Sequence, residues 1–273
     1  MIESALVEHF KTEGFVVVPA LYTADEVDFI KAHFMALNDD AGHGLDIDKP
    51  HLLPDDDPLK AYPRIIHSHR WDKLSLDWML DDRMRRWTTA LLGTEPYAAQ
   101  TMFYFKPPGA RGQALHQDQK PLRVQPGTCL AAWMAVDDCD EENGCLQIVP
   151  RTHDLPMLCP IEADMSQSFS GATVPIPPGS QPEPVIMKAG DVVFFNGYVI
   201  HGSFPNRSET RFRRSFIAHY IVGEAEKVNE FYHPVLNFAG EGLDLLDSEE
   251  GGPCGVFTTE GEPTIEMVDM LEP

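Results

Sequence analysis

Cysteine and basic residues are scarce in this sequence, and long hydrophobic runs are absent. The five cysteines form an odd set without a Cys-x-x-Cys pair, so we expect reduced thiols rather than a disulfide framework or a zinc ribbon. The 21 Lys and Arg residues face 43 Asp and Glu residues, and the charge of −22 argues against binding to nucleic acid or to an anionic membrane. No apolar run could span a membrane, and the first residues lack the features of a signal peptide. We therefore expect a cytoplasmic protein.

The negative charge is concentrated at the end of the chain. Residues 224–273 hold 13 Asp or Glu and one basic residue, Lys227. The apolar residues of this segment, such as Phe231 and Val235, lie near its start. We expect the first part of this acidic extension to pack and its end to be mobile.

The first third of the chain has helical patterns. Apolar residues recur at helical spacing over residues 2–12, which end at Gly14, and "FVVVP" then reads as a short strand. Thr23 and Glu26 have the spacing of a capping box before an apolar helix face. A second long helix is predicted over residues 74–92. These segments predict a helical layer with the first strands in residues 1–95.

From Tyr97 onward, short runs rich in β-branched and aromatic residues alternate with Pro, Gly and Asn. This texture predicts an antiparallel sandwich or barrel, and so a mainly β protein with flanking α-helices. We expect a single domain over residues 1–273, with its β core in residues 96–223. Residues 154–184 are rich in proline and lie between two strands, which favours a lid-like loop over a site rather than a linker.

The segment "ALHQDQ" carries the first candidate ligands. In an extended chain, His116 and Asp118 point to the same face, where they offer one nitrogen and one oxygen to a metal. A third ligand is available in His201, which precedes a Gly-Ser turn. Two imidazoles and one carboxylate leave three octahedral positions open, which suits non-haem ferrous iron that binds a chelate and dioxygen; zinc is the less natural metal.

A group of arginines opens the strand "RFRRSFIAHYIVG". By alternation, Arg213 and Ser215 share one face with Arg211, whereas Arg214 points to the other. A guanidinium inside a barrel requires a carboxylate, and its planar fork binds one bidentately. That carboxylate could come from a 2-oxo acid co-substrate. Arg214 stays an alternative to Arg213 at this stage.

Six blocks ("MFYFKPPG", "ALHQD", "CLAAWMAVDD", "NGCLQIVPRTH", "AGDVVFFNGYVIHGSFPNRS" and "RFRRSFIAHY") resemble the phytanoyl-CoA dioxygenase family of ferrous iron and 2-oxoglutarate dependent oxygenases. The resemblance implies a double-stranded β-helix, a cupin-like jelly roll, with iron on His116, Asp118 and His201. It implies that Arg213 and Ser215 bind the distal carboxylate of 2-oxoglutarate. By the same similarity, co-substrate pocket residues are Trp133, Ser203 and Met102, with Arg64 as a further candidate.

The implied reaction consumes 2-oxoglutarate and dioxygen, releases succinate and carbon dioxide, and hydroxylates an unactivated C–H bond. Asp118 favours hydroxylation over halogenation, while desaturation and ring formation stay open. The acidic chain disfavours coenzyme A as a carrier unless Arg83, Arg85 and Arg86 form a basic patch. We expect a neutral or cationic small molecule of natural-product or amino-acid type, and a monomer or homodimer.

Two other functions fit the sequence. One is a non-catalytic jelly-roll protein that binds a metal or ligand, or acts as a sensor. The other is a cupin-like metal site on His67 and His69, which have ligand spacing but precede the strands. We expect these two histidines to lie at the surface or to line a pocket.

Overall fold

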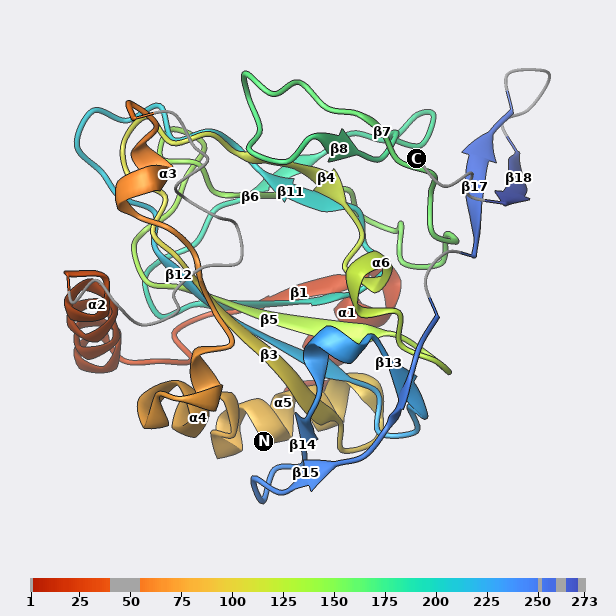
Figure 1. Ribbon diagram of the computed structural model, residues 1–273, viewed down its shortest axis with the longest axis horizontal. Coiled ribbons are helices and arrows are strands. Elements are labelled where there is room, and N and C mark those ends of the chain that lie inside the picture. Colours follow the sequence, from red (N-terminus) through yellow and green to blue (C-terminus); the bar gives the residue numbers. More distant parts are fainter. Residues whose placement is uncertain (1, 40–54, 250–251, 259–263, 270–273) are drawn as a thin grey trace.

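The computed structural model describes residues 2–39, 55–249, 252–258 and 264–269, and contains two antiparallel sheets that face each other (Figure 1). The large sheet has the order β1 (Phe15–Val18), β10 (Val192–Asn196), β5 (Cys129–Ala135), β12 (Ser215–Ile221), β3 (Tyr97–Tyr104), β14 (Val235–Leu236) and β15 (Gly242–Leu243), and β2 (Ile65–Ile66) also pairs with β3. The small sheet has the order β4 (Gln113–His116), β11 (His201–Ser203), β6 (Leu146–Ile148) and β9 (Glu183–Val185). This is the expected double-stranded β-helix with helices outside it.

Helices cover the outer face of the large sheet, as Figure 1 shows for α4 and α5. The described helices are α1 (Ser4–Glu13), α2 (Ala24–Asp39), α3 (Pro58–Ala61), α4 (Lys73–Met79), α5 (Asp82–Leu92) and α6 (Gln119–Leu122). Gly14 ends α1 in the left-handed conformation, at φ 82°. Thr23 and Glu26 form the predicted capping box, since the Glu26 carboxylate accepts from the Thr23 backbone N–H at 2.8 Å. None of the described helices is long and apolar enough to cross a membrane.

The prediction of one helix over residues 74–92 is wrong, because the chain breaks into α4 and α5 after Leu80. Asp81 adopts an extended conformation and caps α5, its carboxylate accepting from the backbone N–H of Arg83 at 2.7 Å. The same carboxylate also binds the Arg83 guanidinium at 2.7 Å. The pair Asp81–Asp82 therefore begins a helix and does not lie within one.

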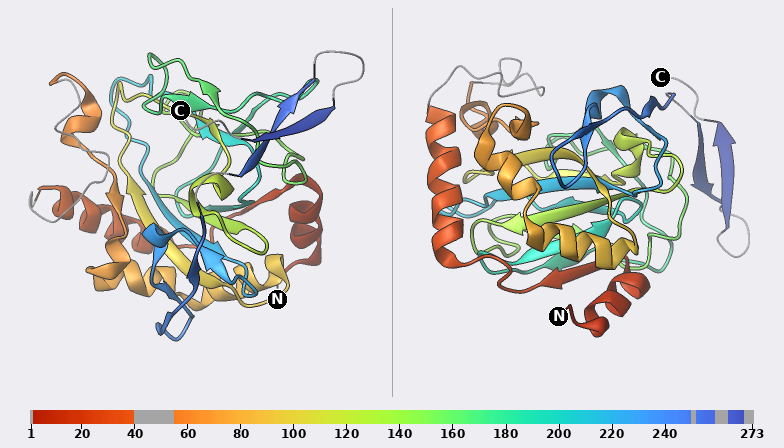
Figure 2. Two further views of the ribbon diagram at one scale, coloured as in Figure 1. Left: turned by 45° about the vertical axis from the view of Figure 1, so that its right-hand side comes forward. Right: turned by 90° about the horizontal axis from the view of Figure 1, so that it is seen from below.

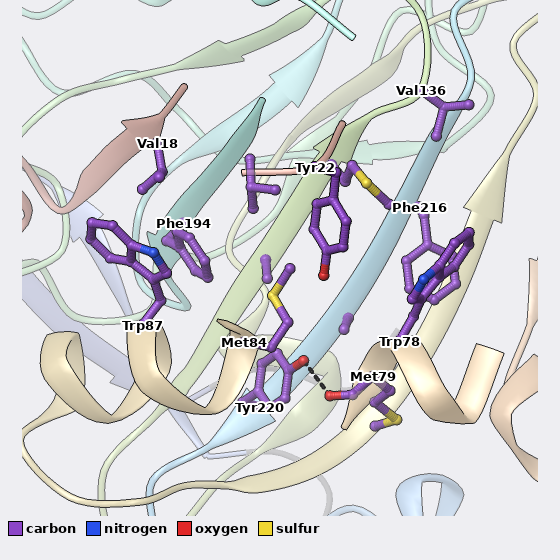
Figure 3. Close-up of a cluster of buried hydrophobic side chains, with 14 of the residues drawn as sticks. Val18, Tyr22, Trp78, Met79, Met84, Trp87, Val136, Phe194, Phe216 and Tyr220 are labelled. Carbon is purple, nitrogen blue, oxygen red and sulfur yellow. Dashed lines mark hydrogen bonds between the residues drawn. The ribbon is translucent and has the colours of Figure 1, made fainter. Parts of the chain in front are cut away.

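Strands β5 and β12 are buried at every position because both of their faces are covered. Phe216 of β12 packs against Trp78 of α4, with ring centres 5.5 Å apart, and Tyr220 lies beside Met79, as Figure 3 shows. The hydroxyl of Tyr220 donates to the carbonyl of Met79 at 2.7 Å (Figure 3). Ile217 points the other way, into a second cluster between the two sheets. The inward face of β12 is therefore the face available to a site.

The proline-rich segment between β6 and β9 runs beside β4. It contains two short strands, β7 (Ile161–Glu162) and β8 (Ala172–Thr173), which pair with each other. The backbone N–H of Val174 donates to the carbonyl of Leu115, and that of Phe169 donates to the carbonyl of Gly112. The loop is thereby attached along the strand that ends at His116.

The expectation of five reduced thiols is wrong, because Cys159 of this loop forms a disulfide with Cys254. Cys254 lies on β17 (Pro253–Phe257), which pairs with β18 (Ile265–Asp269) in a hairpin that projects from the body (Figure 2). The two cysteines are 95 residues apart in sequence, so their spacing carried no sign of the pairing. Cys129, Cys139 and Cys145 are free and buried.

The first part of the acidic extension packs against the body. Its elements are β13 (Lys227–Val228), β14, β15 and β16 (Leu246–Asp247), and β13 pairs with β16. Val228, Tyr232 and Val235 are buried. The mobility expected for the end of the extension stays a prediction: residues 250–251, 259–263 and 270–273 lie outside the described residues, and β17 is attached to the loop through the disulfide.

Candidate metal centre and co-substrate pocket

Two segments far apart in sequence bring His116, Asp118 and His201 together. His116 ends β4, Asp118 precedes α6, and His201 begins β11, where it is the register partner of His116. One ligand atom from each residue lies within 4.8 Å of the others, and within the described ranges no other cluster of three such residues meets this geometry. The distances between candidate ligand atoms are 3.4 Å from His116 Nε2 to Asp118 Oδ1 and 3.6 Å from His201 Nε2 to Asp118 Oδ2.

Backbone carbonyls determine which ring nitrogen of each histidine is free. His116 Nδ1 lies 2.9 Å from the carbonyl oxygen of Ala114, and His201 Nδ1 lies 3.0 Å from that of Val199. A carbonyl only accepts, so both Nδ1 atoms carry a proton, and in the neutral ring the lone pair is then on Nε2. Burial lowers the pKa of His201 to about 4, which keeps the ring neutral at pH 7. Both imidazoles therefore have the form that a metal requires.

Asp118 is the buried carboxylate of the cluster. Burial by itself would raise its pKa, but the imidazoles of His201 and His219 hold the pKa well below its usual value. His219, on β12, donates from Nε2 to Asp118 Oδ2 at 3.0 Å. The donor set of two imidazoles and one ionised carboxylate fits ferrous iron with open positions.

The cluster opens into a cavity of about 270 Å³ between the two sheets. The wall is formed by the three candidate ligands and by Trp133, Met102, Ser203, Arg213 and Arg64, together with His219, Gln100, Gln113, Ile66, Tyr104, Pro121, Leu122, Leu146, Phe195, Gly202, Ile217, Phe231 and Tyr232. Every site residue predicted from the sequence, except Ser215, therefore lines this cavity. Ser215 is fully buried and joins the site through Arg213, whose Nη1 donates to the Ser215 hydroxyl at 2.8 Å.

The sequence left open whether Arg213 or Arg214 binds the co-substrate carboxylate, and the structure distinguishes the two. Arg213 is 2% exposed, faces the cavity and lies over the ring of Trp133 at 5.2 Å. Arg214 points away and forms an ion pair with Asp137 at 2.8 Å. Within the described part of the chain, Arg213 forms no ion pair, so its guanidinium is the one that lacks a carboxylate.

Arg64 reaches the cavity from the segment before β2. Its guanidinium carbon lies 5.1 Å from the ring centres of both Tyr104 and Phe169, and its Nη1 donates to the Tyr104 hydroxyl at 2.7 Å. Phe169 belongs to the proline-rich loop. The loop therefore contacts a residue of the cavity wall.

His67 and His69 are buried rather than exposed, at 5% and 6%. Burial lowers their pKa values to about 3 and about 4. His69 Nδ1 lies 3.0 Å from the hydroxyl of Thr101, and neither histidine belongs to the three-residue cluster found among the described residues. The hypothesis of a cupin-like site on this pair therefore has no support from the geometry.

Three polar residues near the site were missed in the sequence. His219 contacts Asp118, Gln113 donates from its amide to His116 Nε2 at 3.1 Å, and Lys106 donates to the Ser203 hydroxyl at 2.7 Å. His219 had one available signal, because it shares strand parity with Arg213 and Ser215. No local sequence pattern marked Lys106 or Gln113, because only the pairing of the strands brings these two residues to the site.

The fold is a double-stranded β-helix, and its candidate metal ligands are a His-x-Asp pair and a distant His. The sequence profile of the phytanoyl-CoA dioxygenase family matches residues 10–215, and the chain belongs to this family. That match includes all the predicted site residues and the β core as far as Ser215, the first residue of β12.

Curated relatives are 24–29% identical to the chain over the segments that match. It is 29% identical to "Phytanoyl-CoA dioxygenase" of Arabidopsis thaliana over 58% of this chain and 56% of that protein. It is 24% identical to "Phytanoyl-CoA dioxygenase, peroxisomal" of Rattus norvegicus over 89% and 75%. It is 26% identical to "Ectoine dioxygenase" of Stutzerimonas stutzeri over 75% and 72%. The match to the Arabidopsis relative thus spans only about half of that protein.

Solved structures share the fold at lower identity. The carbocyclase SnoK of nogalamycin biosynthesis has a TM-score of 0.68 at 19% identity, over 82% of this chain and 86% of that one. The epimerase SnoN, in complex with Fe3+, alpha ketoglutarate and nogalamycin RO, has a TM-score of 0.67 at 21% identity, over 82% and 84%. Both are non-haem alpha-ketoglutarate dependent enzymes by their descriptions.

Proposed function

We propose that this protein is an Fe(II)- and 2-oxoglutarate-dependent dioxygenase that hydroxylates a C–H bond of a small molecule. The observation that carries this proposal is that one cavity holds both a two-histidine, one-carboxylate cluster and a buried arginine without an ion-pair partner among the described residues. Family membership and the names of the relatives support it.

The candidate ligands are His116, Asp118 and His201, which would hold ferrous iron. Iron of this kind supplies the centre at which 2-oxoglutarate and dioxygen react to give succinate, carbon dioxide and an oxidant for the substrate. Arg213 would bind the distal carboxylate of 2-oxoglutarate, with Ser203 and Ser215 beside it and Trp133 under the guanidinium. The buried walls would exclude bulk water from the reacting groups.

The charged groups of the cavity wall disfavour a cationic substrate. Asp118 is the only carboxylate among the described residues of its wall, and its oxygens are needed for the metal, so a cation would meet no counter-charge. Gln100 and the aromatic residues Phe231 and Tyr232 offer one polar and two apolar contacts. We propose a small neutral substrate that carries few polar groups.

A coenzyme A carrier has little support from the surface arginines. Arg83 pairs with Glu26 and Asp81, and Arg85 and Arg86 both pair with Asp82. These arginines lie on α5, which covers the outer face of the large sheet (Figure 1). The three arginines already form ion pairs with carboxylates, and they lie on the side of the large sheet away from the cavity.

The test is anaerobic addition of Fe(II) and 2-oxoglutarate, monitored by the weak visible charge-transfer band of an iron-chelated 2-oxo acid. The band should vanish in His116→Ala, should need more 2-oxoglutarate in Arg213→Ala, and should be unchanged in Arg214→Ala. Admission of oxygen should then yield succinate. Iron binding without the band or without succinate would contradict the proposal and favour a non-catalytic metal-binding jelly roll.

A further inference from the structure

Lys106 is a buried lysine just after β3, and it is 2% exposed. Its ammonium donates to three oxygens: the carbonyl of Phe204 at 2.6 Å, the hydroxyl of Ser203 at 2.7 Å and the carbonyl of Gly144 at 3.2 Å. Burial, and then the guanidinium of Arg213, lower the pKa of Lys106 well below its usual value. The three acceptors oppose this effect, because a neutral amine has only two N–H groups. The geometry therefore fits a protonated lysine.

Lys106 and Arg213 share one acceptor. The carbonyl oxygen of Gly144 accepts a hydrogen bond from Arg213 Nε at 3.0 Å and another from the Lys106 ammonium. Gly144 has φ 86°, and a Cβ at this position would lie 2.6 Å from the carbonyl oxygen of Phe204, so the turn that presents this carbonyl requires glycine.

The two cations have no carboxylate of their own. Across the described residues, neither Lys106 nor Arg213 forms an ion pair, whereas the neighbouring Arg214 is paired with Asp137. Two adjacent buried cations are unfavourable unless an anion accompanies them. A dicarboxylate that enters the cavity would supply that anion.

Lys106 also orients Ser203. The Ser203 hydroxyl oxygen accepts from Lys106 Nζ and, at 3.1 Å, from the backbone N–H of Gln113. A hydroxyl has two lone pairs and one proton, so both acceptor positions are occupied and the proton must be donated elsewhere. Ser203 lines the cavity together with Arg213, and the cavity is the direction left for that donor.

We propose that Lys106 is a positioning residue for 2-oxoglutarate: it fixes the Ser203 hydroxyl as a donor to the distal carboxylate that Arg213 binds, and it adds a second positive charge behind that donor. This inference rests on the proposed function. Lys106 does not itself line the cavity, so it acts through Ser203 and through the charge that it places beside Arg213. The site would thereby prefer dicarboxylic 2-oxo acids over monocarboxylic ones.

The experiment measures the affinity of the Fe(II)-loaded protein, without oxygen, for 2-oxoglutarate and for pyruvate, which lacks the distal carboxylate. Lys106→Met and Ser203→Ala should each weaken 2-oxoglutarate binding about 10- to 100-fold, the range for a hydrogen bond to a charged group, and leave pyruvate binding unchanged. The double variant should lose less than the product of the two single effects. Lys73→Met, at an exposed lysine paired with Asp77, is the matched control and should change neither affinity.

Equal losses for both acids, or fully multiplicative effects in the double variant, would overturn the inference and leave Lys106 a structural role. If Lys106→Met does not fold, Ser203→Ala decides, because an unchanged preference for 2-oxoglutarate over pyruvate overturns the inference on its own. Failure of the unsubstituted protein to bind either acid would overturn the proposed function as well. If 2-oxoglutarate binds with the same affinity in Lys106→Met and Ser203→Ala as in the unsubstituted protein, the inference is overturned but the proposed function is not.

Discussion

His219 donates a hydrogen bond from Nε2 to Oδ2 of Asp118 at 3.0 Å, although 101 residues separate the two in sequence. A carboxylate only accepts, so the proton lies on Nε2 of the imidazole. His219 belongs to β12, the strand that begins two residues after Arg213. The candidate iron ligand and the candidate co-substrate arginine are therefore held by the same strand.

Replacement of His219 by Phe should weaken metal binding. Asp118 would lose the donor that fixes its carboxylate, and loss of such an outer partner reduces metal affinity about 10- to 100-fold. The measurement is titration of the metal-free protein with Fe(II) under anaerobic conditions, with His219→Gln as a variant that keeps an N–H donor and should recover part of the affinity. Equal affinity in all three proteins would show that the hydrogen bond does not position the ligand.

Arg213→Met and Arg214→Met should have opposite consequences. The first removes a buried cation without an ion pair among the described residues, so half-saturation by 2-oxoglutarate should rise on the order of 100-fold with little loss of thermal stability. The second breaks the pair with Asp137 and should cost about 1 kcal/mol of stability without changing that half-saturation. Melting curves and 2-oxoglutarate titrations of both variants decide; a reversed pattern would assign the carboxylate to Arg214.

Loss of the Cys159–Cys254 disulfide should destabilise the protein. The bond closes a 95-residue loop, and cross-links of this kind contribute about 2–4 kcal/mol. Thermal unfolding with and without a reductant measures the effect. The double variant Cys159→Ala/Cys254→Ala should melt lower than the oxidised protein and should not respond to reductant. A reductant effect that persists in the double variant would point to another cause.

The metal-free protein should lose stability as the pH falls below about 6.5. Burial lowers the pKa values of His67 and His69 to about 3 and about 4, so between those values and 6.5 the unfolded chain binds more protons than the folded one. Each histidine then removes about 1.4 kcal/mol of stability per pH unit across its window. Urea unfolding at pH 7.5, 6 and 5 measures the slope, and His69→Asn should make it shallower. An unchanged slope in that variant would exclude His69 as a contributor.

Local patterns predicted the parts of the fold that local physics determines. Alternation along β12 identified the inward face with Arg213, because a strand buried on both sides still sends neighbouring residues to opposite layers. His116 and Asp118 were recognisable from their two-residue spacing, although β4 ends at His116 and Asp118 lies in the turn before α6, not on the same strand face. The capping box of Thr23 and Glu26 was equally visible, since all its atoms come from one turn.

The features that the sequence did not show depend on contacts across long separations. Lys106 meets Ser203 and Cys159 meets Cys254 only after the sheets and the loop have assembled. The break before α5 is a local feature that was masked by continuous apolar spacing, which outweighed the capping signal of Asp81. Pairings of this kind need a structure, because the residues involved carry no shared local pattern.

The two covered faces of β12 limit how this segment can change during evolution. The side chains of Arg213 and Ile217 line the cavity, and the side chain of Phe216 packs against the helices. Insertion or deletion of one residue between Phe212 and Ile217 would exchange the two faces, sending the aromatic ring into the cavity and the guanidinium towards the helices. Homologous enzymes can therefore diverge here by exchange of side chains but not by a change of length, and the loops are left as the place where lengths can vary.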